Sequence, residues 1–517
     1  MLRQNRIAQL AVIFFLGLSI AAVKTSGNAS GNSASQQPRS LELNKAIEGE
    51  LRKGETQSFQ LALKPLDYAR VAVTVRNADL SLKLFAPDGK PVADYLWPQD
   101  APDPAALSLI AGYTGDYRLE IASQEKDDSA KSYLIKLTTL RPIEKFDAER
   151  VEAERQFAKG EAFRSREVTD ERRPALKHYA EALALWRIVA DREKEGVTLN
   201  ALGRVHDNLG ERDKAFDYFS QTLAIRRELK DRAGEAGALS SLAGIHNSRG
   251  ERPKALELHQ QALDIRRELK DRRGEAASLH NLGQAYLGLN QRDKALEHYE
   301  QALKIRSEEK DRRGEAVTLF QLGVLSRQMG KNDLALKYYN QALPVFRELG
   351  DKRNEAVTYS SLATLFLRQG KRRDGLSYLE KAYEIQHALG ARQGESSTLQ
   401  IMGTVYDEMG EQQKAIEHFT RAEKIQREIN FQPGLGLTLF SFGGVYEGLG
   451  ERKRALDYYN QARPVLRTTG GPAQEALALT TIANVYAAQG DRQTALDYHL
   501  QALSAFTDAK VPDRQAS

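Results

Sequence analysis

Side chains suited to catalysis or metal binding are sparse in this sequence, which has nine histidines and no cysteine. The lack of cysteine excludes disulfides, thiolate metal sites and cysteine nucleophiles. No His-Glu-x-x-His helix, phosphate-binding glycine loop or strand-to-helix nucleophile turn is present. We therefore predict no catalytic residue, no cofactor and no metal ligand, and hence a protein that is not an enzyme.

Most of the histidines fall where other copies of a repeating pattern carry aromatic residues. His206 and His246 stand where those copies have Tyr286, Tyr406, Tyr446 and Tyr486. His259 and His499 stand where they have Phe219, Tyr299 and Tyr339. An imidazole that replaces a ring in the same register indicates packing rather than metal binding.

Aspartates between residues 41 and 140 are the other candidates for a metal site. Their spacing does not match a calcium-binding loop, so we interpret them as turn residues. They are Asp79, Asp88, Asp94, Asp100 and Asp103.

A 40-residue unit is repeated eight times in succession from about residue 195. The elements that this repeat forms must therefore position any functional side chain. Each copy has two large residues three apart, which predicts an apolar helix stripe, and a small residue directly after them. In the first copy these are Leu199, Leu202 and Gly203. A small residue at that point is expected where two helices approach closely.

Further positions mark the ends of the helices. A glycine, or asparagine in one copy, is predicted to end the first helix in the left-handed conformation. It is Gly210, Gly250, Asn290, Gly330, Gly370, Gly410, Gly450 or Gly490. Pro253 fits the first turn of a second helix. Pro344 and Pro464 lie inside second helices and are expected to kink or end them.

The order of large apolar, small, aromatic, glycine, alanine and aromatic positions resembles the tetratricopeptide repeat family, in the 40-residue form of kinesin light chains. The resemblance covers residues 150 to 510. It implies a mainly α protein, a right-handed α-solenoid of helix-turn-helix repeats, that binds protein or peptide partners in its concave groove. The groove positions carried over from the family include Asn200, Arg204, His280, Gln284, Phe320, Val324, Gln400, Phe440 and Asn484.

The N-terminal residues read as an export signal followed by a linker. Residues 1–24 have a basic start and an apolar run, which is typical of a cleaved signal peptide or an uncleaved membrane anchor. Residues 25–40 are rich in Ser, Gly, Asn and Gln, which predicts a flexible linker. Both interpretations place the rest of the chain outside the cytoplasm, as a periplasmic, secreted or surface-anchored protein.

Residues 41–140 alternate polar and apolar residues between turn signals, which predicts a small all-β sandwich of seven or eight strands. The segments GELRKGETQSFQLAL, LSLKLFAPDGKP and AGYTGDYRLEI resemble the bacterial pre-peptidase C-terminal domain. Some members of that family bind calcium or polysaccharide.

Residues 143–194 resemble a degenerate first repeat, in which Ala162 and Phe163 take the apolar and small positions and Trp186 packs at the junction with a neighbouring element. The eight regular repeats span 195–510, and residues 511–517 form a polar tail.

The net charge of +5 is small for 517 residues and does not favour nucleic-acid binding. Arginine clusters in the connecting loops, such as Arg272-Arg273, have acidic residues within four positions. We interpret these loops, which include Asp351-Lys352-Arg353, as solvated ridges of paired charges; the alternative is a basic edge that binds an acidic partner.

We therefore expect an exported, non-catalytic scaffold. The order of signal segment, sandwich and 40-residue repeats also resembles the region ahead of the caspase-like protease domain in bacterial CHAT proteins. Two alternatives therefore remain: the recognition part of a CHAT-type protease system whose catalytic domain is absent here, and polysaccharide or surface binding by the sandwich. A membrane contact would involve residues 1–24 alone, and the oligomeric state is not determined by the sequence.

Overall fold

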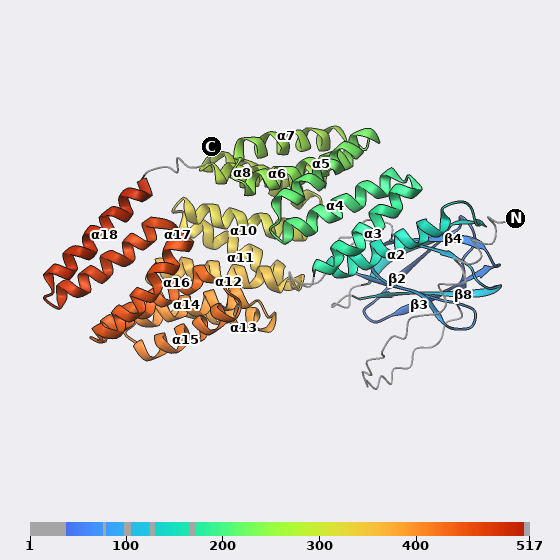
Figure 1. Ribbon diagram of the computed structural model, residues 1–517. Helices are drawn as coiled ribbons and strands as arrows, with labels where there is room; N and C mark the ends of the chain where they lie inside the picture. The colour runs from blue at the N-terminus through green and yellow to red at the C-terminus, as the bar shows by residue number, and fades with distance from the viewer. Residues whose placement is uncertain (1–37, 76–78, 98–104, 125–129, 165–171, 511–517) are drawn as a thin grey trace.

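The computed structural model describes residues 38–75, 79–97, 105–124, 130–164 and 172–510. The expected signal segment, all but the last three residues of the expected linker, the tail 511–517, and Asp100 and Asp103 lie outside this part of the chain. A β domain lies at one end, and pairs of helices wind away from it to the last helix at the other (Figure 1).

The β domain consists of two sheets that enclose one core, with strand orders β1-β3-β8-β5-β6 and β2-β9-β4-β7. Buried and more exposed side chains alternate along strands such as β8, as the sequence predicts. The described residues form nine strands rather than seven or eight, and the shortest has only two residues. The strands are β1 Arg39–Ser40, β2 Ala46–Leu51, β3 Thr56–Leu63, β4 Asp67–Val75, β5 Leu80–Phe85, β6 Pro91–Trp97, β7 Ala105–Ile110, β8 Gly115–Ser123 and β9 Lys131–Pro142.

The rest of the described chain is helical, and each pair of helices packs as an antiparallel hairpin against the next. The helices are α2 Asp147–Arg164, α3 Arg173–Val189, α4 Arg192–Asn208, α5 Arg212–Glu228, α6 Arg232–Ser248, α7 Arg252–Glu268, α8 Arg272–Gly288, α9 Arg292–Glu308, α10 Arg312–Gln328, α11 Asn332–Glu348, α12 Lys352–Arg368, α13 Arg372–Ala388, α14 Arg392–Glu408, α15 Gln412–Glu428, α16 Gln432–Gly448, α17 Arg452–Ala488 and α18 Arg492–Lys510. This is a helical solenoid preceded by a small β domain.

The predicted helix ends are confirmed. Gly210 has φ = 75° and Asn290 has φ = 60°, so both end their helices in the left-handed region. Pro253 lies in the first turn of α7. The two internal prolines do not end their helices, because α11 continues beyond Pro344 and α17 beyond Pro464.

The break in α17 falls instead at Gly471, where φ is 73° and ψ is −171°. Glycine adopts this conformation without steric cost. The segment before Gly471 is the second helix of one repeat, and the segment after it is the first helix of the next.

The first pair, α2 and α3, keeps the repeat packing with a shifted register. A Cβ atom on Gly160 would lie 2.5 Å from Cε1 of Tyr179, so Gly160 is the small residue of this pair. The assignment of that position to Phe163 is therefore wrong. The connection between α2 and α3 is longer than in the regular repeats, which moves the matching residue three positions toward the N-terminus.

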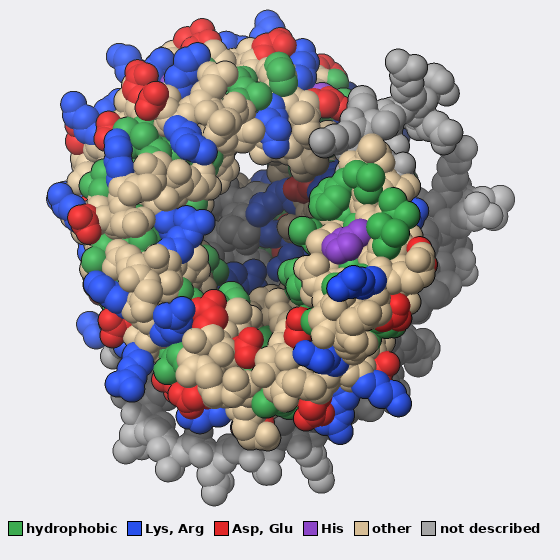
Figure 2. All heavy atoms as spheres, turned by 90° about the vertical axis from the view of Figure 1, so that its left-hand side faces the viewer, with side chains coloured by type: hydrophobic (Ala, Val, Ile, Leu, Met, Phe, Trp, Pro, Cys, Tyr) green, Lys and Arg blue, Asp and Glu red, His purple; other side chains and the backbone are tan. Residues whose placement is uncertain are grey.

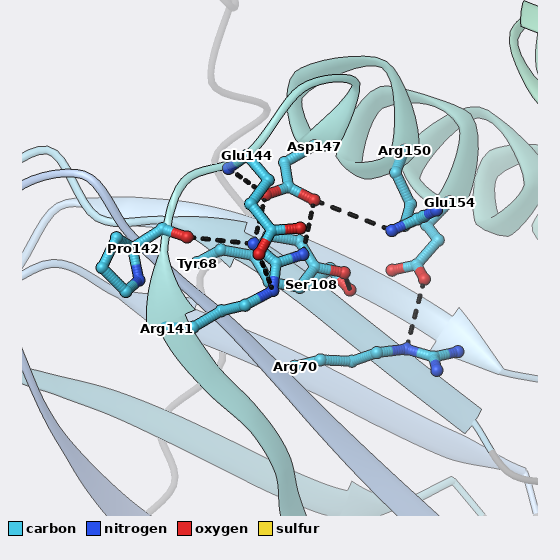
Figure 3. Close-up of polar contacts among 9 residues, drawn as sticks. All are labelled: Tyr68, Arg70, Ser108, Arg141, Pro142, Glu144, Asp147, Arg150 and Glu154. Carbon is cyan, nitrogen blue, oxygen red and sulfur yellow. Dashed lines mark hydrogen bonds and ion pairs between the residues drawn. The ribbon is translucent and has the colours of Figure 1, made fainter. Parts of the chain in front are cut away.

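Helix α2 packs against β6 and β7 and attaches the β domain to the solenoid. The Asp147 carboxylate is buried and accepts hydrogen bonds from Arg141 Nη1 at 2.7 Å, Arg141 Nη2 at 3.0 Å and the Glu144 amide at 2.7 Å. Figure 3 shows Arg150 on the other side of this carboxylate and Arg70 of β4 reaching Glu154.

Trp186 is buried in the cluster that joins the first helices, and Trp97 of β6 packs against the same cluster. This agrees with the predicted junction role of Trp186. None of the helices in the described ranges has the length and hydropathy that a membrane span requires.

Candidate functional site

The first helices of successive repeats form the inner layer of the solenoid. Helix α8 approaches α10, α10 approaches α12 and α14 approaches α16, while successive second helices approach each other less closely. In a curved stack the closer layer lies on the inside of the bend. Figure 2, seen from the α18 side, shows the helices around a central hollow with Lys and Arg side chains in its depth.

The inner layer is held close to the outer layer by pairs of a glycine and an aromatic ring. A Cβ atom on Gly203 would lie 2.6 Å from Cε1 of Phe219, and one on Gly323 would lie 2.6 Å from Cε1 of Tyr339. The same pairing recurs as Gly160/Tyr179, Gly283/Tyr299, Gly403/Phe419 and Gly443/Tyr459.

Three repeats carry alanine instead of glycine at this position, and each of them has a smaller or differently shaped partner. The pairs are Ala243/His259, Ala363/Leu379 and Ala483/His499. A six-membered ring therefore requires glycine, while leucine or histidine leaves room for one methyl group. The sequence contains this correlation, although only the structure shows that the two residues touch.

Arginines of the connecting loops are largely paired, as the sequence predicts. Arg232 Nη1 contacts Glu235 at 2.6 Å, and Arg232 Nη2 contacts Glu268 of the same repeat at 2.8 Å. The arrangement recurs at Arg192, Arg272, Arg312 and Arg392. Each of these guanidinium groups holds the start of a first helix to the end of the second helix of its own repeat.

The predicted groove residues do not all lie on an open surface. Arg204, Gln284 and Asn484 are exposed, whereas Asn200, Val324 and Gln400 are half-buried. Phe320 and Phe440 are also half-buried, because their rings tilt against Tyr339 at 5.6 Å and Tyr459 at 5.1 Å between centroids.

His280 is buried against Tyr299, with ring centroids 5.2 Å apart, and therefore belongs to the core rather than to an open surface. Burial lowers the pKa of His280 to about 3, so the imidazole is neutral near pH 7. His259 behaves alike, and burial lowers its pKa to about 4. Within the described ranges no three His, Asp or Glu residues are placed to hold a metal ion.

The sequence predicted Asn200 and Arg204 on the inner side of α4 but not the other residues of that side. On α4 the side of the helix turned away from α5 carries Glu193, Val197, Asn200, Arg204 and Asn208, none of which is fully buried. These five positions and their equivalents in later first helices are called the inner-face positions. Their spacing along the chain places them on one side of an α-helix, and this spacing can be read from the sequence. Extending the two predicted positions of each helix to this whole side required the curvature of the solenoid.

Comparisons with known proteins agree with this architecture. The family model described as tetratricopeptide repeat matches residues 175–228, 234–308, 314–386, 354–428 and 434–508. A search of the curated proteins found no match.

Similar solved structures share the helical repeats. A signal transduction ATPase with a tetratricopeptide repeat sensor from Pyrococcus horikoshii has a TM-score of 0.51 and 15% identity, and the match covers 66% of this chain and 55% of that one. BtubC from P. vanneervenii has a TM-score of 0.40 and 26% identity, with 42% and 92% covered. The quorum sensor NprR from B. thuringiensis, in its apo form, has a TM-score of 0.47 and 13% identity, with 64% and 97% covered.

The likeness to the ATPase concerns the fold alone. The matched family model covers more than half of the chain, in phase with the helix pairs. The chain belongs to the tetratricopeptide repeat family.

Proposed function

We propose that this protein is a non-catalytic scaffold that binds a segment of a protein partner along the inner face of its solenoid. The observation that carries the proposal is the continuous inner layer that the first helices form. On α4, for example, none of the residues at the inner-face positions is fully buried. A preformed curved surface of this kind can bind a segment without reshaping.

The test is a selection of peptides from a random library on the full-length protein. Gln284→Trp on α8 and Asn484→Trp on α17 add bulk at two exposed inner-face positions. We expect the selected peptides to bind these variants at least about tenfold more weakly, as a steric block at the centre of an interface does.

Lys304→Trp is the matched control, because Lys304 is an exposed residue on the second helix α9. Peptides that bind Lys304→Trp poorly and both inner-face variants normally would contradict the proposal, as would a selection that enriches no peptide.

We further propose that the protein is exported, on the support of the basic and apolar residues 1–24. Fusion of residues 1–40 to a reporter that is active only outside the bacterial cytoplasm should give activity. The same fusion without residues 1–24 should be inactive, and activity in both would contradict export.

A further inference from the structure

Charge is distributed unevenly along the inner-face positions. On α8, α10 and α12 these positions hold four arginines, Arg273, Arg313, Arg353 and Arg368, and neither Asp nor Glu. On α16 and on the part of α17 after Gly471 they hold no charged residue at all. Between these two parts, α14 has a single charge, Glu408, which pairs with Arg372 at 3.0 Å. The inner face therefore changes from basic to uncharged along the solenoid.

A row of exposed apolar side chains begins on the last helix of the basic part and continues into the uncharged part. The exposed fractions are 42% for Val357, 38% for Ile401, 45% for Leu437 and 59% for Leu477. Val357, Leu437 and Leu477 occupy the same inner-face position in three repeats. On α14 that position is Ser397, and the exposed apolar residue is Ile401, one helical turn later. In earlier repeats that position holds Gly237, Ala277 or a half-buried valine. This row of exposed apolar residues thus begins at α12.

Arg353 differs from its equivalent in the preceding repeat in having no acidic partner. Arg313 Nη2 contacts Asp351, the residue before the next first helix, at 3.2 Å. The residue equivalent to Asp351 one repeat later is Ala391. No ion pair joins Arg353 or Arg273 to another residue in the described part of the chain, and both are exposed. Their guanidinium groups are available to a partner.

We propose that the inner face binds one polypeptide segment in which acidic residues are followed or preceded by apolar residues, with carboxylates on Arg273 and Arg353 and apolar side chains on Val357, Ile401, Leu437 and Leu477. This rests on the proposed function and names its ligand. The partner carries the charge opposite to α8–α12 and buries the apolar row, which water otherwise covers.

The spacing of the helices sets the size of the segment. Neighbouring first helices lie about 10 Å apart, and an extended chain covers about 3.3 Å per residue. The distance from α8 to α17 then corresponds to about 15 residues, with an anchor at about every third residue. Residues 1–37 of the chain contain neither Asp nor Glu, so they do not supply the acidic part.

The test uses fluorescence polarisation with a labelled peptide of about 16 residues, in which Glu and then Leu recur at every third position between serines. Control peptides replace the Glu residues by Gln or the Leu residues by Ser. We expect both control peptides to bind the full-length protein at least about tenfold more weakly than the Glu and Leu peptide. The difference in affinity between the Glu and Gln peptides should decrease as the salt concentration rises.

The decisive variant is Ala391→Asp. It places a carboxylate at the position from which Asp351 contacts Arg313, and we expect Arg353 to gain a partner of its own. The same aspartate is expected to stabilise α14, so weaker peptide binding cannot be attributed to unfolding. We expect about threefold to tenfold weaker binding of the Glu peptide and no change for the Gln peptide.

Two further variants complete the test. Arg273→Glu with Arg353→Glu should abolish the preference for Glu over Gln, and Leu437→Ser with Leu477→Ser should abolish the preference for Leu over Ser. Lys304→Glu on α9 is the matched charge control and should change neither preference.

Several outcomes would overturn the inference. Equal binding of the Glu and Gln peptides, or an unchanged affinity in Ala391→Asp and Arg273→Glu/Arg353→Glu, would reject it. A single-stranded oligonucleotide that binds as tightly as the Glu peptide, with the same sensitivity to these variants, would show a general polyanion surface instead. If library peptides bind the inner face without preference for acidic and apolar residues, the proposed function stands and this ligand assignment fails.

Discussion

The pairing of glycine with an aromatic ring is the residue-scale feature that fixes how closely two helices of a repeat pack. Gly323 lies against Tyr339. In the next repeat the equivalent residues are Ala363 and Leu379. Interiors are close-packed, so one added methyl group displaces a ring that has no space behind it.

We expect Gly323→Ala to lower the free energy of unfolding by about 1–3 kcal/mol, despite the better helix propensity of alanine. Combined with Tyr339→Leu, which reproduces the Ala363/Leu379 pair, the loss should be smaller than the sum of the two single losses. Urea unfolding of the two single variants and the double variant measures the coupling.

Gly237→Ala is the matched control for this experiment. A Cβ atom on Gly237 would meet no other atom within 4 Å, so this substitution should stabilise α6 by up to about 1 kcal/mol. Strict additivity of Gly323→Ala and Tyr339→Leu would contradict the steric explanation.

Buried histidines make the stability of the solenoid depend on pH. Burial lowers the pKa of His280 to about 3 and that of His259 to about 4, whereas in the unfolded chain both have a pKa of about 6.5. The unfolded state therefore binds more protons below pH of about 6.5, and stability falls as the pH decreases from there toward the folded pKa values.

We expect His280→Phe with His259→Leu to remove part of this loss, of the order of 1 kcal/mol per pH unit for each histidine. Both replacements occur at the equivalent positions, as Phe320 and Leu379. Denaturant unfolding at pH 7 and at pH 5 gives the change in the free energy of unfolding with pH for the natural chain and for the variant. A variant as sensitive to acid as the natural chain would show that other groups cause the dependence.

At the scale of the element, the first helices differ in how they begin. The side chains of Asp231, Asp271 and Asp311 accept a hydrogen bond from the backbone amide three residues later, which satisfies a donor of the first turn. The capping residue before α14 is Ala391 and the one before α16 is Phe431, and neither side chain makes such a bond.

We expect Ala391→Asp to raise the free energy of unfolding by about 1 kcal/mol, since it supplies the missing acceptor to α14. Asp311→Ala should lower it by a similar amount. Thermal melting followed by circular dichroism compares the two. A decrease in stability with Ala391→Asp would contradict the explanation and would remove that variant's value as a binding test.

At the scale of the whole molecule, the β domain and the solenoid are joined by buried charges and by apolar packing on α2. Asp147 is 1% exposed and holds Arg141 of β9, and Ala158 of α2 belongs to the core of the β domain. Helix α2 therefore packs into the core of the β domain as well as into the first helix pair of the solenoid.

Asp147→Ala removes the buried acceptor of the hydrogen bonds from Arg141 and the Glu144 amide, and we expect a loss of about 1–3 kcal/mol in the free energy of unfolding. Limited proteolysis should then cut between the β domain and α2 before it cuts the solenoid. Asp88→Ala removes an exposed pair with Lys90 and serves as the control. Equal protease resistance of the two variants would contradict a structural role for Asp147.

Sequence periodicity alone determined the repeats, the ends of the helices and the β domain, because each depends on residues that are near neighbours along the chain. Glycine caps such as Gly210, the small residues such as Gly203 and the alternation in β8 are local signals with a local physical cause.

Tertiary structure decided how open each of the predicted groove positions is. The sequence predicted His280 and Phe320 for the groove, yet their rings pack against Tyr299 and Tyr339. That prediction did not include Val357 and Leu477, and it placed Arg353 among the paired charges of the connecting loops. A helix exposes more than one side, and only the stacking of repeats, set by contacts 40 residues apart, selects the side that lies on the inside of the curve.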